Sequence, residues 1–309
     1  MRVLFWGTPL FSIPSLDGLH GSTEHELISV VTQPDKPRGR GMRTSPSPVK
    51  ERAIEISVGV LQPASTKDED FVARVKSLEP DISVVVAYGK ILHREILDVP
   101  HHGSVCIHPS FLPKYRGAAP IQRAIMDGAK TTGVTLFQMD EGMDTGPIIL
   151  RKSVSISDDD TLDSLSEKLS LESRDLLLEG LSLISKGEAK AVPQEEEASV
   201  APRISKEEAL IDWGSEAQMI ERRIRAFNSK PGAYTIIGGK TLKIYRAGLA
   251  PEEHDAEPGT VVRVLDDRVV VATGSGWLAL FELQLEGKKR MDVASYLRGR
   301  KIEVGTKLG

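Results

Sequence analysis

The sequence is poor in cysteine and lacks long apolar runs. Cys106 is the only cysteine among 309 residues, so no disulfide can form within the chain. The opening run MRVLFWG is too short and too quickly broken for a secretory signal. No later segment approaches the ~18 apolar residues that a membrane span needs. These absences argue against a disulfide-stapled secreted domain and against a membrane protein, and we expect a cytoplasmic protein.

The chain also lacks a strong net charge, because 40 Lys and Arg residues face 44 Asp and Glu, a net of −4. That total alone argues against a nucleic-acid-binding protein, but the charges are unevenly spread. Residues 33–50 hold five basic residues and one acidic residue, and the part after residue 205 is slightly basic. Two basic patches are compatible with a polyanion that touches only part of the surface. Solvated side chains would explain either patch alone equally well.

The first ~150 residues alternate apolar runs with amphipathic stretches, and the length of the chain suits two domains. Ser47-Pro48 predicts a helix start, and Thr66 with Glu69 predicts a capping box before a second helix. A long helix is expected over residues 160–185. Strands that alternate with helices predict a parallel or largely parallel α/β sheet covered on both faces. The expected strands are residues 3–6, 27–32, 82–87, 105–108 and 134–139.

The remainder of the chain has a different pattern. Residues 186–204 are polar, acidic and without periodicity, which predicts a linker between domains at 1–185 and 205–309. Ser205 and Glu208 form another capping-box pattern, and residues 219–227 read as a basic amphipathic helix. From residue 233 onward, short β-rich runs are separated by Gly, Asp and Pro turns. Such runs predict a small antiparallel barrel.

His108 ends a predicted strand, in the segment VCIHPS. Ligands bind beyond the carboxyl ends of strands in such sheets, so we expect a site after Ala87, His108 and Met139. Alternation places Cys106, His108 and Ser110 on one face if the strand stays extended past Pro109. An imidazole there would suit a proton shuttle. A half-buried histidine bonded to the backbone is the alternative, and for this segment alone it is the more frequent case.

Residues 138–146 form an acidic loop after another predicted strand, with three carboxylates and two glycines in nine residues. One carboxylate close to His108 would fix the tautomer of the imidazole and order a water molecule. A metal site is the rival interpretation, because Asp140, Glu141 and Asp144 resemble an oxygen-ligand loop. The full calcium-loop spacing is lacking, so we expect no metal.

Residues 108–125 (HPSFLPKYRGAAPIQRAI) and 132–146 (TGVTLFQMDEGMDTG) closely resemble the folate-dependent formyltransferase family. Further matches, such as FWGTPLFS, TQPDKPRGRGMRTSPSPVK, VVVAYGKIL, IDW and IRAFN, extend the resemblance over nearly the whole chain. It implies a Rossmann-like N-terminal formyltransferase domain and a C-terminal barrel-like (OB-like) domain that helps to hold tRNA. Within the family, the branch that formylates methionyl-initiator tRNA is the most similar.

The resemblance also implies roles for particular residues. The co-substrate would be 10-formyltetrahydrofolate, with His108 as general acid and base and Asp144 positioning both that histidine and a water molecule. The residues expected along the folate are Ser110, Phe111, Leu112 and Pro113, and those expected around its pterin are Ala87, Tyr88, Gly89, Ile91, Leu92, Asp140 and Gly142.

Cys106 departs from the family pattern, which has Asn at this place to donate to the formyl oxygen. A thiol is a weak donor, and loss of one such donor typically slows turnover by about 10²–10³. The protein could be a slow enzyme, or a nearly inactive homologue that only binds tRNA or folate. A Cys106 thiolate that accepts the formyl group is the third interpretation, and it requires a lowered pKa for the thiol.

Basic residues favour tRNA over a small amine as the partner. The family also formylates glycinamide ribonucleotide and amino sugars, and one branch hydrolyses formylfolate. The glycinamide ribonucleotide branch lacks the C-terminal unit, and the hydrolase branch lacks the PRGRG loop. Several cations on a mobile loop can follow a phosphate backbone. We therefore expect a monomer that binds initiator methionyl-tRNA and no membrane, through Lys36, Arg38, Arg40, Arg43, Arg222, Arg223, Lys288, Lys289 and Arg290.

Overall fold

The computed structural model describes residues 1–38, 43–195, 197–251 and 255–309. They form two compact units, each assembled from three stretches of chain. The first consists of Met1–Pro120, Thr131–Ser155 and Ser166–Ala201, and the second of Ile121–Lys130, Ile156–Leu165 and Pro202–Gly309. The described helices include none with the length and apolar character of a membrane span.

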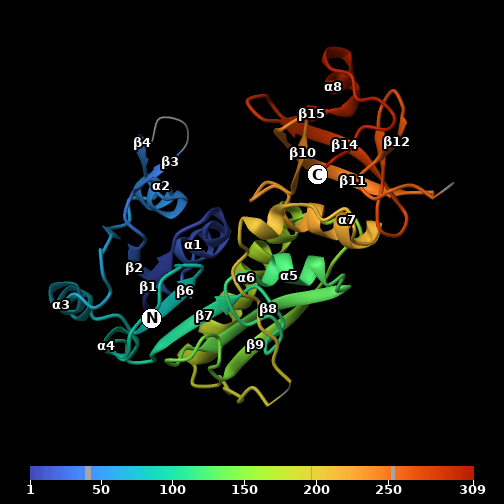
Figure 1. Ribbon diagram of the computed structural model, residues 1–309. Helices are drawn as coiled ribbons and strands as arrows, with labels where there is room; N and C mark the ends of the chain where they lie inside the picture. The colour runs from blue at the N-terminus through green and yellow to red at the C-terminus, as the bar shows by residue number, and fades with distance from the viewer. Residues whose placement is uncertain (39–42, 196, 252–254) are drawn as a thin grey trace. The chain divides into compact units, whose positions relative to one another are not determined.

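A seven-stranded sheet forms the centre of the first unit, in the order β5-β2-β1-β6-β7-β8-β9 (Figure 1). The pairs from β5 to β7 are parallel, whereas β8 and β9 are antiparallel to their neighbours. The predicted largely parallel α/β sheet is therefore confirmed. The strands are β1 (Arg2–Gly7), β2 (Glu26–Val31), β5 (Val60–Leu61), β6 (Ile82–Val86), β7 (Ser104–His108), β8 (Thr131–Gln138) and β9 (Ile148–Ser155), with a separate hairpin of β3 (Lys36–Arg38) and β4 (Arg43–Ser45).

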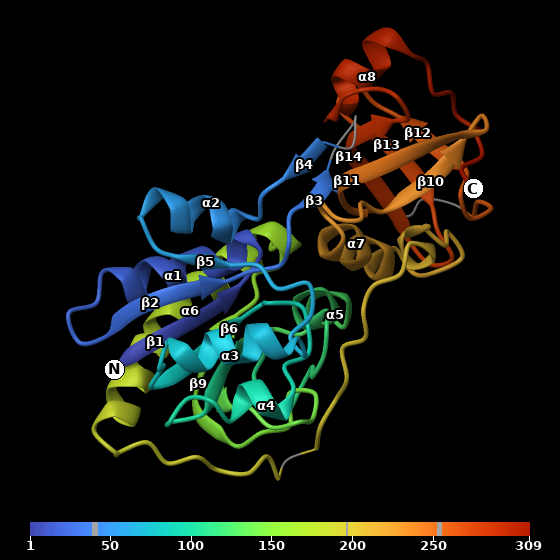
Figure 2. The same ribbon diagram turned by 90° about the vertical axis from the view of Figure 1, so that its left-hand side faces the viewer.

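Helices cover both faces of this sheet (Figure 2). On one face, α3 (Glu69–Ser77) and α4 (Arg94–Leu97) pack with β1 and β6 around Trp6 and Val85. The other face carries η1 (Leu10–Ser12), α1 (Ile13–His20), α2 (Pro48–Glu55) and α6 (Leu162–Ser185). Gly180 of α6 lies against Leu136 of β8, so closely that a Cβ atom at this glycine would collide with that side chain. The fold thus holds β7, which carries His108, in the buried middle of the sheet.

The helix starts show which capping signals are formed. Ser47 accepts a hydrogen bond from the Lys50 amide and caps α2, as predicted. The predicted capping box at Thr66 is wrong, because Asp68 caps α3 by accepting from the Phe71 amide at 2.9 Å. The actual cap lies two residues after the expected one and satisfies the Phe71 amide rather than the Glu69 amide, and the buried Thr66 hydroxyl donates to the Ile91 carbonyl instead.

The second unit contains an antiparallel sheet in the order β10-β11-β14-β13-β12, with β15 paired to β14. It forms a half-barrel, which confirms the predicted fold class. Ser205 and Glu208 make the reciprocal bonds of the predicted capping box, at the start of a 3-10 turn. The elements are α5 (Pro120–Met126), η2 (Glu207–Ala209), α7 (Ala217–Ala226), β10 (Tyr234–Ile237), β11 (Lys240–Ala250), β12 (Val261–Val264), β13 (Val269–Ala272), β14 (Trp277–Leu285), β15 (Met291–Asp292) and α8 (Val293–Gly299).

Candidate active site

The loop between β8 and β9 reaches His108 by a route that the sequence does not indicate. Because β8 runs antiparallel to β7, Met139 leaves the sheet beside the start of β7, where its amide donates to the Ser104 carbonyl at 2.8 Å. The loop then returns over β7 and places Asp144 Oδ2 at 3.5 Å from His108 Nδ1. The structure therefore brings together two of the predicted catalytic residues, although the carboxyl end of β8 lies at the opposite edge of the sheet.

His108 is buried, with 5% of its surface exposed, and each ring nitrogen faces an oxygen acceptor. Nε2 lies 2.9 Å from the Tyr115 carbonyl oxygen. A carbonyl can only accept, so this bond requires the proton on Nε2 and leaves Nδ1 as the lone-pair nitrogen of the neutral ring. If Nδ1 takes up a proton, the Asp144 carboxylate stands ready to stabilise the charge. This geometry suits a histidine that gains and loses a proton at Nδ1.

The carboxylates of the acidic loop have separate partners. Asp144 has a left-handed backbone, with φ of 57°, and its Oδ2 accepts from the Gly117 amide at 2.8 Å. Asp140 instead closes the turn by accepting from the Gly142 amide at 3.0 Å and the Thr145 hydroxyl at 2.7 Å. No group of three or more His, Cys, Asp or Glu side chains suited to a metal ion occurs in the described part of the chain.

Cys106 lies two residues before His108 on β7 and is half-buried against the apolar cluster around Trp6. Burial, and secondly the negative charge of Asp144, raise the pKa of the Cys106 thiol well above its usual range. The thiol is therefore protonated at neutral pH, and its Sγ is only 3.6 Å from the Ile107 carbonyl as a weak donor. Both facts oppose the interpretation in which a thiolate accepts the formyl group.

A pocket of about 470 Å³ lies at the other end of β7. It is lined by Leu97, Ser104, Met139, Asp140 and Glu141, among others. Ser104 and His108 are four residues apart on the strand, which corresponds to about 13 Å. Of this lining only Asp140 was predicted as a site residue. Leu97 and Met139 were missed because apolar residues next to predicted elements look like ordinary core.

The predicted pterin segment after β6 is a strained turn rather than an open loop. Ala87 and Gly89 both have positive φ, at 50° and 80°. The Tyr88 carbonyl already accepts from the Thr8 hydroxyl at 2.9 Å and the Gln33 amide at 2.8 Å. Tyr88 and Leu92 are buried in the core, and burial raises the pKa of Tyr88 to about 12. Ile91 is different, because the residue is 70% exposed.

The predicted folate segment after β7 is stabilised by its own hydrogen bond and by burial. The Ser110 hydroxyl donates to the Lys114 carbonyl at 2.6 Å, and Leu112, which is fully buried, precedes a cis Pro113. Phe111 is half-buried, with the Arg151 guanidinium 4.5 Å from its ring centre. Phe111 is therefore the side chain of this segment with surface available to a ligand.

The predicted RNA-binding residues fall into two groups. Near the N-terminus, Lys36 Nζ donates to Gln33 at 2.6 Å, Arg38 and Arg43 pair as backbone positions of β3 and β4, and Arg40 lies outside the described residues. In the second unit, Lys288 and Lys289 are exposed. Arg290 makes two bonds of 2.7 Å to Glu282 and lies 4.3 Å from the Tyr245 ring centre, so its charge is already paired.

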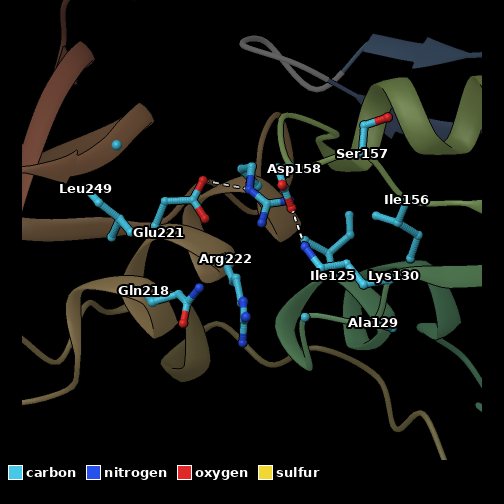
Figure 3. Close-up of a pocket in the computed structure, with 13 residues that line it drawn as sticks. Ile125, Ala129, Lys130, Ile156, Ser157, Asp158, Gln218, Glu221, Arg222 and Leu249 are labelled. Atoms are coloured by element: carbon cyan, nitrogen blue, oxygen red, sulfur yellow. Dashed lines mark hydrogen bonds and ion pairs between the residues drawn. The ribbon is translucent and has the colours of Figure 1, made fainter.

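Arg222 lies in a pocket of about 350 Å³ within the second unit (Figure 3). Two other cations of the lining are paired: Lys130 with Asp158 at 2.5 Å, and Arg225 with Glu221 at 2.6 Å. Within the described residues Arg222 has no hydrogen bond or ion pair. Its guanidinium lies against Gly128, where a Cβ atom would collide with it. Its neighbour Arg223 is half-buried. The pocket therefore presents one uncompensated positive charge.

Comparison with known proteins identifies the family. The model of the formyl transferase family matches residues 1–181, and the model of the formyl transferase C-terminal domain matches residues 203–301. The chain belongs to the formyl transferase family. Methionyl-tRNA formyltransferases of Pelotomaculum thermopropionicum and Thermus thermophilus are each 44% identical to it, over 100% of this chain and 99% of theirs.

Solved structures of more distant proteins share the fold. Methionyl-tRNA formyltransferase from Clostridium thermocellum is similar with a TM-score of 0.58 and 19% identity, over 81% of this chain and 94% of that one. HypX from Aquifex aeolicus, in complex with tetrahydrofolic acid, has a TM-score of 0.67 and 19% identity, over 99% of this chain and 50% of that one. At these identities the likeness establishes the fold alone.

Proposed function

We propose that this protein transfers the formyl group of 10-formyltetrahydrofolate to the amino group of methionyl-initiator tRNA. The observation that carries this conclusion is the 44% identity, from end to end, with methionyl-tRNA formyltransferases. Relatedness over the whole length includes the C-terminal half-barrel as well as the unit with His108.

The surroundings of β7 fit a folate. The 470 Å³ pocket is within the usual size for a small-molecule site and combines apolar walls at Leu97 and Met139 with carboxylates at Asp140 and Glu141. A pterin offers the matching chemistry, a flat ring with N–H donors at its edge. Ile91 and Met143, which are 70% and 66% exposed and do not line this pocket, lie on the loops after β6 and β8 that the family resemblance assigns to the pterin. No metal is needed in this scheme, because the folate supplies an activated formyl group.

His108 would transfer protons during the reaction, and Asp144 would stabilise its charged form. The methionyl amine loses a proton as its nitrogen bonds to the formyl carbon, and the departing folate nitrogen gains one. His108 can accept the first proton at Nδ1 and return it from there, because Nε2 keeps its own proton on the Tyr115 carbonyl. The Asp144 carboxylate stabilises the imidazolium between the two transfers. Cys106 would add only a weak donor near the formyl oxygen, which predicts a slow but working enzyme.

Arg222 would hold a phosphate of the tRNA. A half-buried guanidinium without an acidic partner is suited to a phosphodiester, which it can bind through two parallel N–H bonds. Further phosphate contacts would come from Arg223, Lys288 and Lys289, and from Lys36, Arg38, Arg40 and Arg43. We place the enzyme in the cytoplasm as a monomer, with the boundary between its domains at residues 186–204.

A formylation assay tests the proposal. Purified protein would receive 10-formyltetrahydrofolate and methionyl-initiator tRNA, with formylmethionine as the readout. We expect turnover by the wild-type chain, loss of at least about 10²-fold with His108→Ala, and unchanged turnover with His20→Ala, an exposed histidine at the end of α1. Binding of tRNA and folate without any turnover would refute the enzymatic part of the proposal.

A further inference from the structure

The segment that joins α6 to the second half of the chain is tied to the candidate active site. The connector (residues 192–195 and 197–201) pairs with the start of β9, where Val192 and Ile148 exchange backbone bonds of 2.7 and 2.8 Å. At its other end, Arg116 donates to the Ser199 carbonyl at 2.8 Å and accepts from the Ala201 amide at 2.6 Å. The connector thus crosses from the acidic loop to the loop that follows His108.

Gln194 of the connector links these two loops through a single side chain. Its Nε2 donates to the Asp144 carbonyl at 3.0 Å and to the Gly146 carbonyl at 2.7 Å. Its Oε1 accepts from Nε and Nη2 of Arg116 at 3.1 and 2.7 Å. Each hydrogen-bonding group of the amide is used, and the reversed amide would place its N–H donors against the guanidinium donors and its oxygen against the carbonyl oxygens. The orientation of this side chain is therefore fixed from both sides.

Gln194 binds next to Asp144, a residue whose backbone conformation and carboxylate position are both constrained. Asp144 has a left-handed backbone, which is costly for a residue with a Cβ, and its carboxylate must stay within reach of His108. The Asp144 carboxylate accepts from the Gly117 amide, and Arg116, the preceding residue, is held by Gln194. Gln194 thereby holds Asp144 by its own carbonyl and, through Arg116, by the partner of its carboxylate.

We propose that Gln194 is a positioning residue that sets the Asp144 carboxylate opposite His108 Nδ1. This inference rests on the proposed function for its effect on rate, and on geometry alone for its effect on the histidine. A displacement of about 1 Å in such a constellation can slow turnover by about 100-fold. Gln194 touches neither His108 nor the pocket lining near β7, so substrate binding should change little.

Two substitutions separate the halves of the linkage. Gln194→Ala removes the bonds to Arg116 and also the bonds to the Asp144 and Gly146 carbonyls. Gln194→Glu keeps an acceptor for Arg116 and removes only the donors to Asp144 and Gly146. We expect kcat to fall about 100-fold with either change, with KM for folate and tRNA within a few-fold of wild type. Glu195→Ala, at the exposed next residue, is the matched control and should leave kcat unchanged. A Gln194→Glu variant as fast as wild type would show that only the Arg116 half matters and would overturn the proposal.

A double-mutant cycle and an NMR measurement complete the test. In an Asp144→Asn background, Gln194→Ala should add little further loss of kcat, because its effect passes through Asp144. Fully additive losses would refute this route. NMR of isotope-labelled histidine should show altered His108 ring-nitrogen signals in Gln194→Ala but not in Glu195→Ala. If the wild-type chain did not formylate tRNA, the proposed function would fail, and unchanged His108 signals would separately refute the positioning role.

Discussion

Replacement of Cys106 by Asn gives a quantitative test of how this site stabilises the reaction. The thiol is protonated at neutral pH, since burial and the charge of Asp144 raise its pKa, and it is a weak donor. An amide at this position would supply a strong N–H donor beside His108. Removing one such donor from other active sites slows turnover by about 10²–10³. A partly aligned new donor should therefore raise kcat about tenfold or more.

The same substitution has a predictable cost in stability. Cys106 packs against the apolar cluster around Trp6, and an amide there buries a polar group with incomplete hydrogen bonding. This costs about 1–3 kcal/mol of unfolding free energy, or about 2–4 °C in Tm for each kcal/mol in a domain of this size. We thus expect a variant that is faster and less stable, measured by initial formylation rates at saturating substrates and by thermal unfolding.

Two further variants isolate the cause. Cys106→Ser places a stronger O–H donor in nearly the same volume and should fall between wild type and Asn. Cys106→Ala removes the thiol without adding a donor. It should change kcat by less than about threefold, because the thiol is only a weak hydrogen-bond donor. A folded Cys106→Asn variant no faster than wild type, at unchanged tRNA affinity, would refute the donor argument. Loss of all activity in Cys106→Ala would instead support the interpretation in which the Cys106 thiolate accepts the formyl group. Mass spectrometry of the enzyme would then test for a formyl thioester.

Three other predictions follow from the charged groups and the thiol. Arg222→Ala should weaken tRNA binding and lower the slope of log K against log salt by about one, as measured by filter binding, while folate affinity is unchanged; an unchanged slope would remove Arg222 from the tRNA site. Arg40→Ala combined with Arg43→Ala should likewise weaken tRNA binding and flatten its salt dependence, and the same titration with folate is the control. Above pH ~8.5 the unfolded chain loses the Cys106 proton while the folded chain retains it, so the free energy of unfolding should fall as pH rises in wild type. Urea unfolding of Cys106→Ala should lack this part of the fall, and parallel curves for both proteins would contradict the raised pKa.

Much of the fold could be predicted from local patterns. Buried parallel strands appear in sequence as apolar runs, so the pattern predicts β1, β6 and β7. Ser47 is a favourable N-cap residue and predicts the start of α2. The start of α3 was misplaced because Thr66 and Asp68 both suit an N-cap, and only the tertiary bond from Thr66 to the Ile91 carbonyl decides between them. Local sequence contains no signal for that choice.

The candidate site was predictable in its chemistry but not in its supports. His108 and Asp144 could be predicted because His108 ends a predicted strand and Asp144 lies in the loop after another, where ligands bind in such sheets, and the family resemblance gave them roles. Gln194 was invisible, because its neighbours are acidic and aperiodic and its partners are backbone carbonyls nearly 50 residues away. The antiparallel direction of β8 was equally hidden, since an apolar run does not reveal the direction of its neighbours.

The second unit is assembled from three separate stretches of chain, and this limits how its gene can recombine. A fragment that begins at residue 205 would leave behind Arg123, which pairs with Glu208 at 2.6 Å, and Asp160, whose carbonyl accepts from Arg225 at 2.8 Å. It would also lose Asp163, the acceptor of the Ser229 hydroxyl at 2.7 Å. Exchange of the C-terminal part between genes at one crossover point would therefore separate residues that fit each other. Recombination that preserves the unit must carry three stretches of chain together, which favours descent of the two halves as a single coding block.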